Sequence, residues 1–193
     1  RSVSRGLGDV YKRQPEDYAR YLDAAQPVEA QGFILPYGDQ PFDQENVAEM
    51  VYVDILNRAT RYVHIMTPYL ILNYNMISAL TFAAKRGVDV RLIYDDFGSL
   101  LGLPKDFVVR MERAHIRCIP FNPVVPLLSL VMNHRDHRKI VVIDGKVAYT
   151  GGINLADEYI NAITRFGYWK DAGLRIEGTA VWNFTVMFLD FWN

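Results

Sequence analysis

The sequence is nearly free of cysteine. Its only thiol, Cys118, can form no internal disulfide and no thiolate metal site, so the chain suits a reducing compartment and no metal centre is expected. Neither sign of charge dominates, because 21 Lys and Arg residues stand against 22 Asp and Glu, for a formal net charge of -1. The chain therefore lacks the overall basic field that attracts nucleic acid, and a local cluster of residues must bind any anion.

Long apolar runs are also missing. Residues 121–132, "FNPVVPLLSLVM", fall short of the roughly 18 apolar residues of a membrane span and contain two prolines. Residues 1–14 have neither the apolar core nor the cleavage site of a signal peptide, and we interpret them as a non-native lead-in. The final "VMFLDFWN" stops inside an apolar helical pattern, which predicts that the natural protein continues past Asn193.

Two common phosphate-binding loops are absent, since no G-x-G-x-x-G follows the first expected strand and no G-x-x-x-x-G-K-[ST] occurs. Half of the residues are hydrophobic, which is enough for one domain with a sizeable core. We expect a linker-like segment over 15–42, with a turn-rich loop at 36–43, and a single domain over 43–193.

Hydrophobic periodicity predicts an α/β fold with a mostly parallel β-sheet flanked by helices. Helices are expected at 44–61, 75–86, 105–114 and 154–163 and from 179 onward. Strands are expected at 62–69, 88–96, 115–121, 139–144, 146–151 and 172–178, with the fourth and fifth joined by the turn dipeptide Asp144-Gly145.

The richest stretch is "NHRDHRKIVVIDGKVAYTGGIN", residues 133–154. His137 and Lys139 lie two residues apart at the mouth of an expected strand, so both side chains should project from one face and converge. An imidazole beside an ammonium suits attack on an anion, because the ammonium neutralises phosphate oxygens while the ring acts as nucleophile or general acid. This pair predicts phosphoryl chemistry without a metal.

A second anion contact is expected after the glycine pair that ends at Gly152. Asn154 should cap the next helix, with Asp157 in the capping-box position, and the glycines let backbone amides approach a ligand. Asp144, seven positions after His137, should face the other way and serve as a turn former or supporting group.

The segment "HRKIVVID", six further residues and "GGIN" match the HKD signature H-x-K-x4-D-x6-G-[GS]-x-N of the phospholipase D superfamily. The resemblance runs from Pro15 to the end of the chain and is strongest to bacterial cardiolipin synthases. The segments that carry it are "IMTPYL", "YDDFGS", "NHRDHRKIVVIDGKVAYTGGINLADEYI" and "FGYWKDAGLRIEGTAVWNFTVMFLDFWN".

This resemblance implies a set of site residues and no cofactor. In the family a histidine attacks a phosphodiester to form a phosphohistidine, and the histidine of a second HKD motif protonates the departing alcohol. Carried over, the catalytic set is His137, Lys139, Asp144, Asn154 and Asp171, with the phosphate bound by Lys139, Asn154 and Gly152. Asp171 would orient the imidazole, with Glu158 as the alternative and a solvated loop carboxylate as the plain interpretation. His134 is either a phosphate contact or part of a solvated basic loop.

The chain departs from the family in two ways. Only one HKD motif is present, whereas a cardiolipin synthase has two homologous halves. Residues before 83–91 resemble the linker and the opening of the second half, and residues after it resemble the first half. We interpret the chain as a fragment or a repeat-collapsed hybrid; the alternative is a true single-HKD protein that completes its site by dimerisation.

The leading hypothesis is a phosphatidyltransferase half-domain acting on a phosphatidylglycerol-like lipid at a membrane surface, with 121–132 as an apolar lip. Its partner would be a second HKD half or another copy, without which the chain should be inactive, and the membrane anchor would lie in the parent protein. The alternatives are a homodimeric HKD nuclease or phosphodiesterase, disfavoured by the charge, and a non-catalytic dimerising module. His64 is expected in the core and His115 at an exposed strand edge.

Overall fold

The computed structural model describes residues 31–39, 45–99, 102–123, 135–156, 158–159, 163, 167 and 169–193. Residues 31–193 form one compact unit. Its strands are β1 Gly32–Asp39, β2 Tyr62–Thr67, β3 Leu70–Ile71, β4 Asp89–Asp95, β5 Ile116–Phe121, β6 Ile140–Ile143, β7 Val147–Gly151, β8 Leu155–Ala156 and β9 Asp171–Gly178. Its helices are α3 Val47–Arg58, α4 Tyr74–Lys85, α5 Asp96–Ser99, α6 Phe107–Arg113 and α7 Val181–Trp192.

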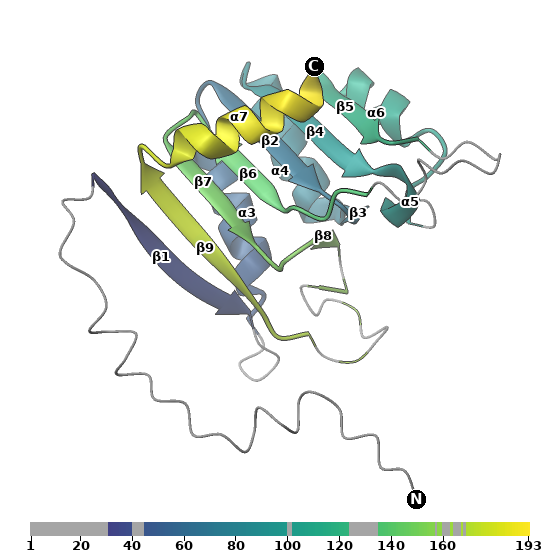
Figure 1. The fold of residues 1–193 in the computed structure, drawn as a ribbon. Coiled ribbons are helices and arrows are strands. Elements are labelled where there is room, and N and C mark those ends of the chain that lie inside the picture. Colours follow the sequence, from purple (N-terminus) through teal and green to yellow (C-terminus); the bar gives the residue numbers. More distant parts are fainter. Residues whose placement is uncertain are drawn as a thin grey trace, which may run out of the picture. The chain divides into compact units, whose positions relative to one another are not determined.

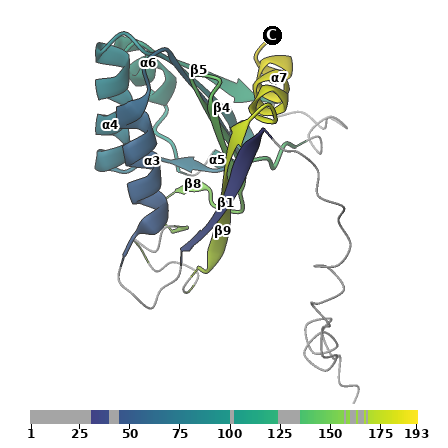
Figure 2. The ribbon, with the colours of Figure 1, turned by 90° about the vertical axis from the view of Figure 1, so that its left-hand side faces the viewer.

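A seven-stranded sheet with the order β1-β9-β7-β6-β2-β4-β5 forms the centre of the molecule. Helices α3, α4 and α6 cover one face and α7 crosses the other (Figures 1 and 2). Strands β1, β2, β4, β5 and β7 point one way, and β6 and β9 run against them. The α/β class predicted from the sequence is confirmed, with neighbouring strands parallel in the β2-β4-β5 part and antiparallel elsewhere.

Burial on both faces explains the apolar character of the central strands. Residues 63–67 of β2 are all buried, as expected for a strand covered by helices on both sides. Helix α3 buries Tyr52 and Leu56 on one face of the sheet, while α7 buries Val181 and Phe188 on the other. The start of α4 is fixed by Asn73, whose side chain accepts a hydrogen bond from the backbone N–H of Met76 at 2.9 Å.

The structure overturns two local predictions. Residues 155–156, expected in a short helix, form β8 and pair in parallel with β3. Pairing with Leu70 buries Leu155, and this tertiary contact outweighs the weak helical pattern. The turn-rich loop expected at 36–43 is wrong for residues 36–39, which belong to β1. This strand pairs with β9, and Pro36 is tolerated there because β1 lies at the edge of the sheet.

The reversed direction of β6 determines where His137 and Lys139 lie. Met66, near the end of β2, pairs with Ile140 at the start of β6. The residues that precede Ile140 therefore lie at the end of the sheet where the carboxyl ends of β2 and β4 lie. Three short segments meet there: 68–70 after β2, α5 after β4, and 135–139 before β6.

Candidate active site

His137 and Lys139 converge, as their spacing predicts. The ammonium nitrogen of Lys139 lies 2.9 Å from Nδ1 and 3.3 Å from Nε2 of His137, and it donates to the carbonyl oxygen of His137 at 2.9 Å. Lys139 is buried, whereas His137 is exposed. An exposed imidazole therefore lies beside a buried ammonium that is hydrogen-bonded to the backbone.

Burial also changes the acidity of Lys139. It lowers the pKa of the ammonium to about 8, against the opposing effect of the negative charges of Asp171 and Asp136. Both carboxylates thus act electrostatically on Lys139. At neutral pH most Lys139 side chains still carry the positive charge that a phosphate group requires.

Asp171 lies against the glycine pair. Gly152 donates its backbone N–H to the carbonyl oxygen of Ala172 at 3.0 Å, and a Cβ atom at Gly152 would overlap the Asp171 carboxylate. The Oδ1 atom of Asp171 accepts the N–H of Ala172 at 2.8 Å. The absent side chain at Gly152 therefore leaves the space that the acid occupies. The contact of Asp171 with the imidazole of His137 stays a prediction.

Asn154 follows the glycine pair in the sequence, and its side chain is buried. It does not cap a helix, because β8 follows it directly. Its Oδ1 atom is buried and has no hydrogen-bond partner among the residues that the structure describes. Rotating the amide by 180° would place the nitrogen there, ready to donate to a phosphate oxygen. A buried unsatisfied amide is uncommon, so this atom is a good candidate for ligand contact. Asp157, its expected capping partner, lies outside the described residues.

Asp144 does not join the site. It follows β6 at the end opposite to His137, with a left-handed φ of 56°. Its carboxylate accepts the N–H groups of Thr60, Arg61 and Tyr62 and the hydroxyl of Thr60, at 2.7–2.9 Å. The motif's aspartate therefore fixes the connection between α3 and β2, and its inclusion in the catalytic set needs correction.

An aromatic wall beside His137 is the feature that the sequence analysis missed. The ring of Tyr69 meets the His137 ring edge-on, with centroids 6.0 Å apart and an interplanar angle of 84°. Tyr69 stacks on Tyr159 at 5.9 Å, and Tyr159 contacts Trp169 at 4.5 Å. The sequence feature that could have indicated it is the tyrosine of "IMTPYL", Tyr69, because it closely follows a strand whose carboxyl end lies at the site.

The other expected residues take different places. Glu158 is buried next to Tyr159, and its role as an alternative orienting acid stays open. His64 is buried in the core and His115 is exposed just before β5, as expected. His134 and residues 124–132 of the expected apolar lip lie outside the described residues. Within the described residues no group of three or more His, Cys, Asp and Glu side chains could hold a metal ion.

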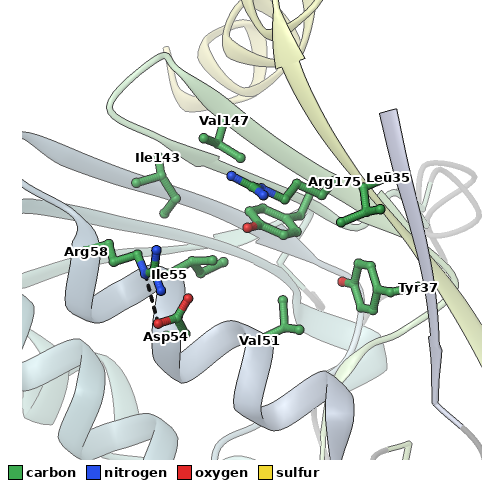
Figure 3. A pocket seen from close by; sticks show the side chains of 10 residues that line it. Leu35, Tyr37, Val51, Asp54, Ile55, Arg58, Ile143, Val147 and Arg175 are labelled. Atoms are coloured by element: carbon green, nitrogen blue, oxygen red, sulfur yellow. Dashed lines mark hydrogen bonds and ion pairs between the residues drawn. The ribbon is translucent and has the colours of Figure 1, made fainter. Parts of the chain in front are cut away.

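A cavity of about 310 Å³ lies between α3 and the sheet (Figure 3). Leu35, Val51 and Ile55 contribute apolar lining, and the ion pair of Arg58 with Asp54 borders it. Its lining also includes Ile143, which lies at the Asp144 end of β6. The cavity is therefore separate from the His137 end of this strand.

The fold and the paired His137 and Lys139 define a phospholipase D-like domain, and sequence comparison agrees. Residues 52–164 match the family model described as "Cardiolipin synthase, PLD-like domain". The chain belongs to this family.

Named relatives point the same way. The chain is 39% identical over 143 residues to a cardiolipin synthase of Geobacillus sp., covering 71% of this chain and 28% of that protein. It is 38% identical over 161 residues to cardiolipin synthase 2 of Staphylococcus epidermidis, covering 81% and 31%. An uncharacterized protein of Streptococcus mutans is 50% identical over 118 residues, covering 61% and 26%. The chain thus spans about a quarter to a third of the length of these relatives.

Solved structures share the fold. The phospholipase D family member Nuc from Salmonella typhimurium has a TM-score of 0.60 at 19% identity, with 83% of this chain and 95% of that chain covered. Phosphatidylserine synthase from Haemophilus influenzae has a TM-score of 0.55 at 13% identity, with coverage of 81% and 37%. Among the described residues, no helix has the length and apolarity needed to cross a membrane.

Proposed function

We propose that the chain is one half of a cardiolipin synthase-type phosphatidyltransferase, with His137 as the group that becomes phosphorylated. The observation that carries this proposal is the contact between the buried Lys139 ammonium and the exposed His137 ring at 2.9 Å. An ammonium donates to a ring nitrogen only through that nitrogen's lone pair, which is the electron pair that a nucleophile needs.

The proposed reaction has two displacements. A ring nitrogen of His137 attacks the phosphorus of an anionic phospholipid, and the bond from phosphorus to the departing glycerol oxygen breaks. A second imidazole gives that oxygen its proton. The hydroxyl of an acceptor lipid then passes its proton to this second imidazole and attacks the phosphohistidine, which breaks the phosphorus–nitrogen bond and frees His137.

The residues around His137 support the phosphate during both steps. Lys139 neutralises one oxygen when its ammonium turns from the ring to the substrate, and Asn154 offers its amide to another. Gly152 leaves the space that the Asp171 carboxylate occupies, and Asp171 is proposed to hold the tautomer of His137. The charge that develops on the phosphate thus meets a cation and an amide fixed by buried backbone.

One chain places His137 on one side of the phosphorus atom. In-line displacement also needs an acid on the opposite side, to protonate the departing oxygen. We propose that a second HKD half, or a second copy of this chain, supplies it at a membrane surface. His64 is buried under α7 and His115 lies at the opposite end of the sheet from the site, before β5, so neither can complete the pair. A homodimeric phosphodiesterase remains the second candidate because the chain has one motif.

The test follows labelled phosphatidylglycerol in vesicles. The chain alone, the chain at rising concentration and the chain mixed with a second HKD half are compared, with His137→Ala as the inactive variant and His115→Asn as the matched control. We expect acid-labile phosphate on the protein and lipid turnover only when the second half or self-association is present. Turnover that stays first order in monomeric protein would show that the two-histidine argument is wrong.

A further inference from the structure

We propose that Asp95 and Ser99, at the two ends of the "DDFGS" turn, are positioning residues that hold His137 in place through Arg135 and Tyr69. The inference rests on the proposed role of His137 as the reacting group. It assigns a role to α5, the short helix that Figure 1 places at the end of β4.

The first arm runs from Ser99 to Tyr69. Ser99 is fully buried; its hydroxyl donates to the carbonyl oxygen of Pro68 at 3.3 Å and accepts the N–H of Leu70 at 3.2 Å. These two bonds hold both neighbours of Tyr69. Thr67 adds a third, from its hydroxyl to the carbonyl oxygen of Tyr69 at 2.9 Å. The backbone of Tyr69 is therefore fixed on each side.

Close packing completes this arm. A Cβ atom at Gly98 would lie 2.5 Å from the carbonyl oxygen of Pro68 and 3.3 Å from the ring of Tyr69. The helix α5 thus lies directly against the loop and the ring. Tyr69 in turn meets the His137 ring edge-on, an arrangement that aromatic pairs favour. A displacement of α5 would therefore move the Tyr69 ring, which contacts the imidazole of His137 directly.

The second arm runs from Asp95 to residues 135–139, the loop that precedes β6. The Oδ1 atom of Asp95 accepts the N–H of Gly98 at 2.9 Å and also accepts a hydrogen bond from Nη1 of Arg135 at 3.3 Å. Arg135 donates to the carbonyl oxygen of Asn122 at 2.9 Å as well, and it lies over the ring of Phe97. Because Arg135 precedes His137 by two residues, the loop that carries the imidazole is tied to the same turn.

The burial of Asp95 favours a positioning role over a stabilising one. Its side chain is only 4% exposed, and within the described part of the chain its Oδ2 atom has no hydrogen-bond partner. Such a carboxylate is costly to bury, and a buried ion pair is weak evidence for stability. His137 itself is exposed, and it precedes β6 rather than lying within it. The orientation of the imidazole therefore depends on contacts such as those with Tyr69 and through Arg135.

The experiment observes the His137 ring directly, in the 193-residue chain with isotope-labelled histidine. Ring proton signals are assigned by loss in His137→Ala, and Tyr69→Leu calibrates the shift caused by removing the neighbouring ring. Ser99→Ala and Asp95→Asn are the test variants. Asp89→Asn is the matched control on the same strand, since Asp89 pairs with Arg91 and Arg117 at the opposite end of β4. Thr185→Val removes a buried hydroxyl from α7 as the second control.

We expect the His137 signals to move in Ser99→Ala and Asp95→Asn and to stay in both controls, while Tyr69→Phe matches the parent. With a second HKD half present, kcat should fall about tenfold to hundredfold in the test variants with KM within about twofold, because misplacement of about 1 Å has effects of this size. Thermal melting checks folding, and Ser99→Ala keeps the test decisive if Asp95→Asn does not fold.

Unmoved His137 signals in Ser99→Ala, or moved signals with unchanged kcat, would overturn the proposal. Failure of the proposed function has a different signature: lipid turnover would persist in His137→Ala. The ring signals would then still report the geometry.

Discussion

Nζ of Lys139 lies 2.9 Å from Nδ1 of His137 and is bonded at the same distance to the carbonyl oxygen of that residue. The ammonium is thus held by the backbone of the residue whose ring it contacts. Burial lowers its pKa to about 8, although Asp171 and Asp136 oppose this. The charge of this candidate site therefore changes near pH 8.

Binding of a phosphodiester should weaken as the pH rises through 8. A soluble diester such as dimethyl phosphate keeps a constant charge, so its affinity follows the protonation of Lys139. Between pH 7 and pH 9 we expect a loss of about tenfold, measured by calorimetry or NMR titration. In Lys139→Arg the loss should vanish, because guanidinium stays protonated. Equal pH dependence in both proteins would contradict the assignment of Lys139.

Gly152→Ala should damage the site more than the fold. Its Cβ atom would overlap the Asp171 carboxylate, which must move. We expect diester binding and lipid turnover with a second half to fall at least about tenfold, since displaced groups commonly have this effect. Gly38→Ala is the matched control, because its Cβ atom would lie 3.4 Å from the backbone oxygen of Asp171, an ordinary contact. Equal losses in the two variants would count against a role for the carboxylate.

Asp144→Ala should destabilise the chain by about 2–3 kcal/mol, because several donors lose one charged acceptor. Burial acts to raise the pKa of Asp144, but hydrogen bonds from Thr60, Tyr62 and Arg61 outweigh it and lower the pKa. Its stabilising effect should therefore be present at neutral pH and disappear as the pH falls through that lowered pKa. Denaturant unfolding measures both effects.

Asp106→Ala provides the comparison for Asp144. Its side chain makes no capping bond to α6, so the expected change in unfolding free energy is below about 0.5 kcal/mol. The result that would refute a structural role for Asp144 is a stable Asp144→Ala variant whose His137 no longer becomes phosphorylated.

His64 should make the fold acid-sensitive. Its ring stacks between Tyr62 at 4.5 Å and Phe188 at 4.4 Å. Burial, assisted by the positive charge of Arg91, lowers its pKa to about 4. The folded state then binds fewer protons than the unfolded state between pH 4 and pH 6.5, so stability falls as the pH drops through this range.

Urea unfolding at pH 7 and pH 4.5 tests this. We expect the parent to lose about 1 kcal/mol more than His64→Phe, after allowing for solvent screening. His115→Asn, which suits the left-handed φ of 60° at that exposed position, should behave like the parent. Identical acid sensitivity in the parent and His64→Phe would rule out this role.

Local patterns were enough to predict the central strands and the convergence of His137 with Lys139, because both depend on a few consecutive residues. Features that depend on distant segments were not predictable in this way. The pairing of Leu155 with Leu70 replaced an expected helix, and the bonds that Asp144 makes with Thr60 join positions far apart in the chain. Tyr69 reaches His137 only because β6 runs against β2, a direction that the sequence pattern does not reveal.

Strand β6 is short, and it is paired with β2 on one side and β7 on the other. Its side chains alternate between the two faces of the sheet, so a slip of one position would exchange those faces. Inserting or deleting one residue in the turn at Asp144 and Gly145 would invite such a slip and redirect Lys139. The length of this turn therefore constrains the register of the strand, even though the turn lies at the end of β6 opposite to Lys139.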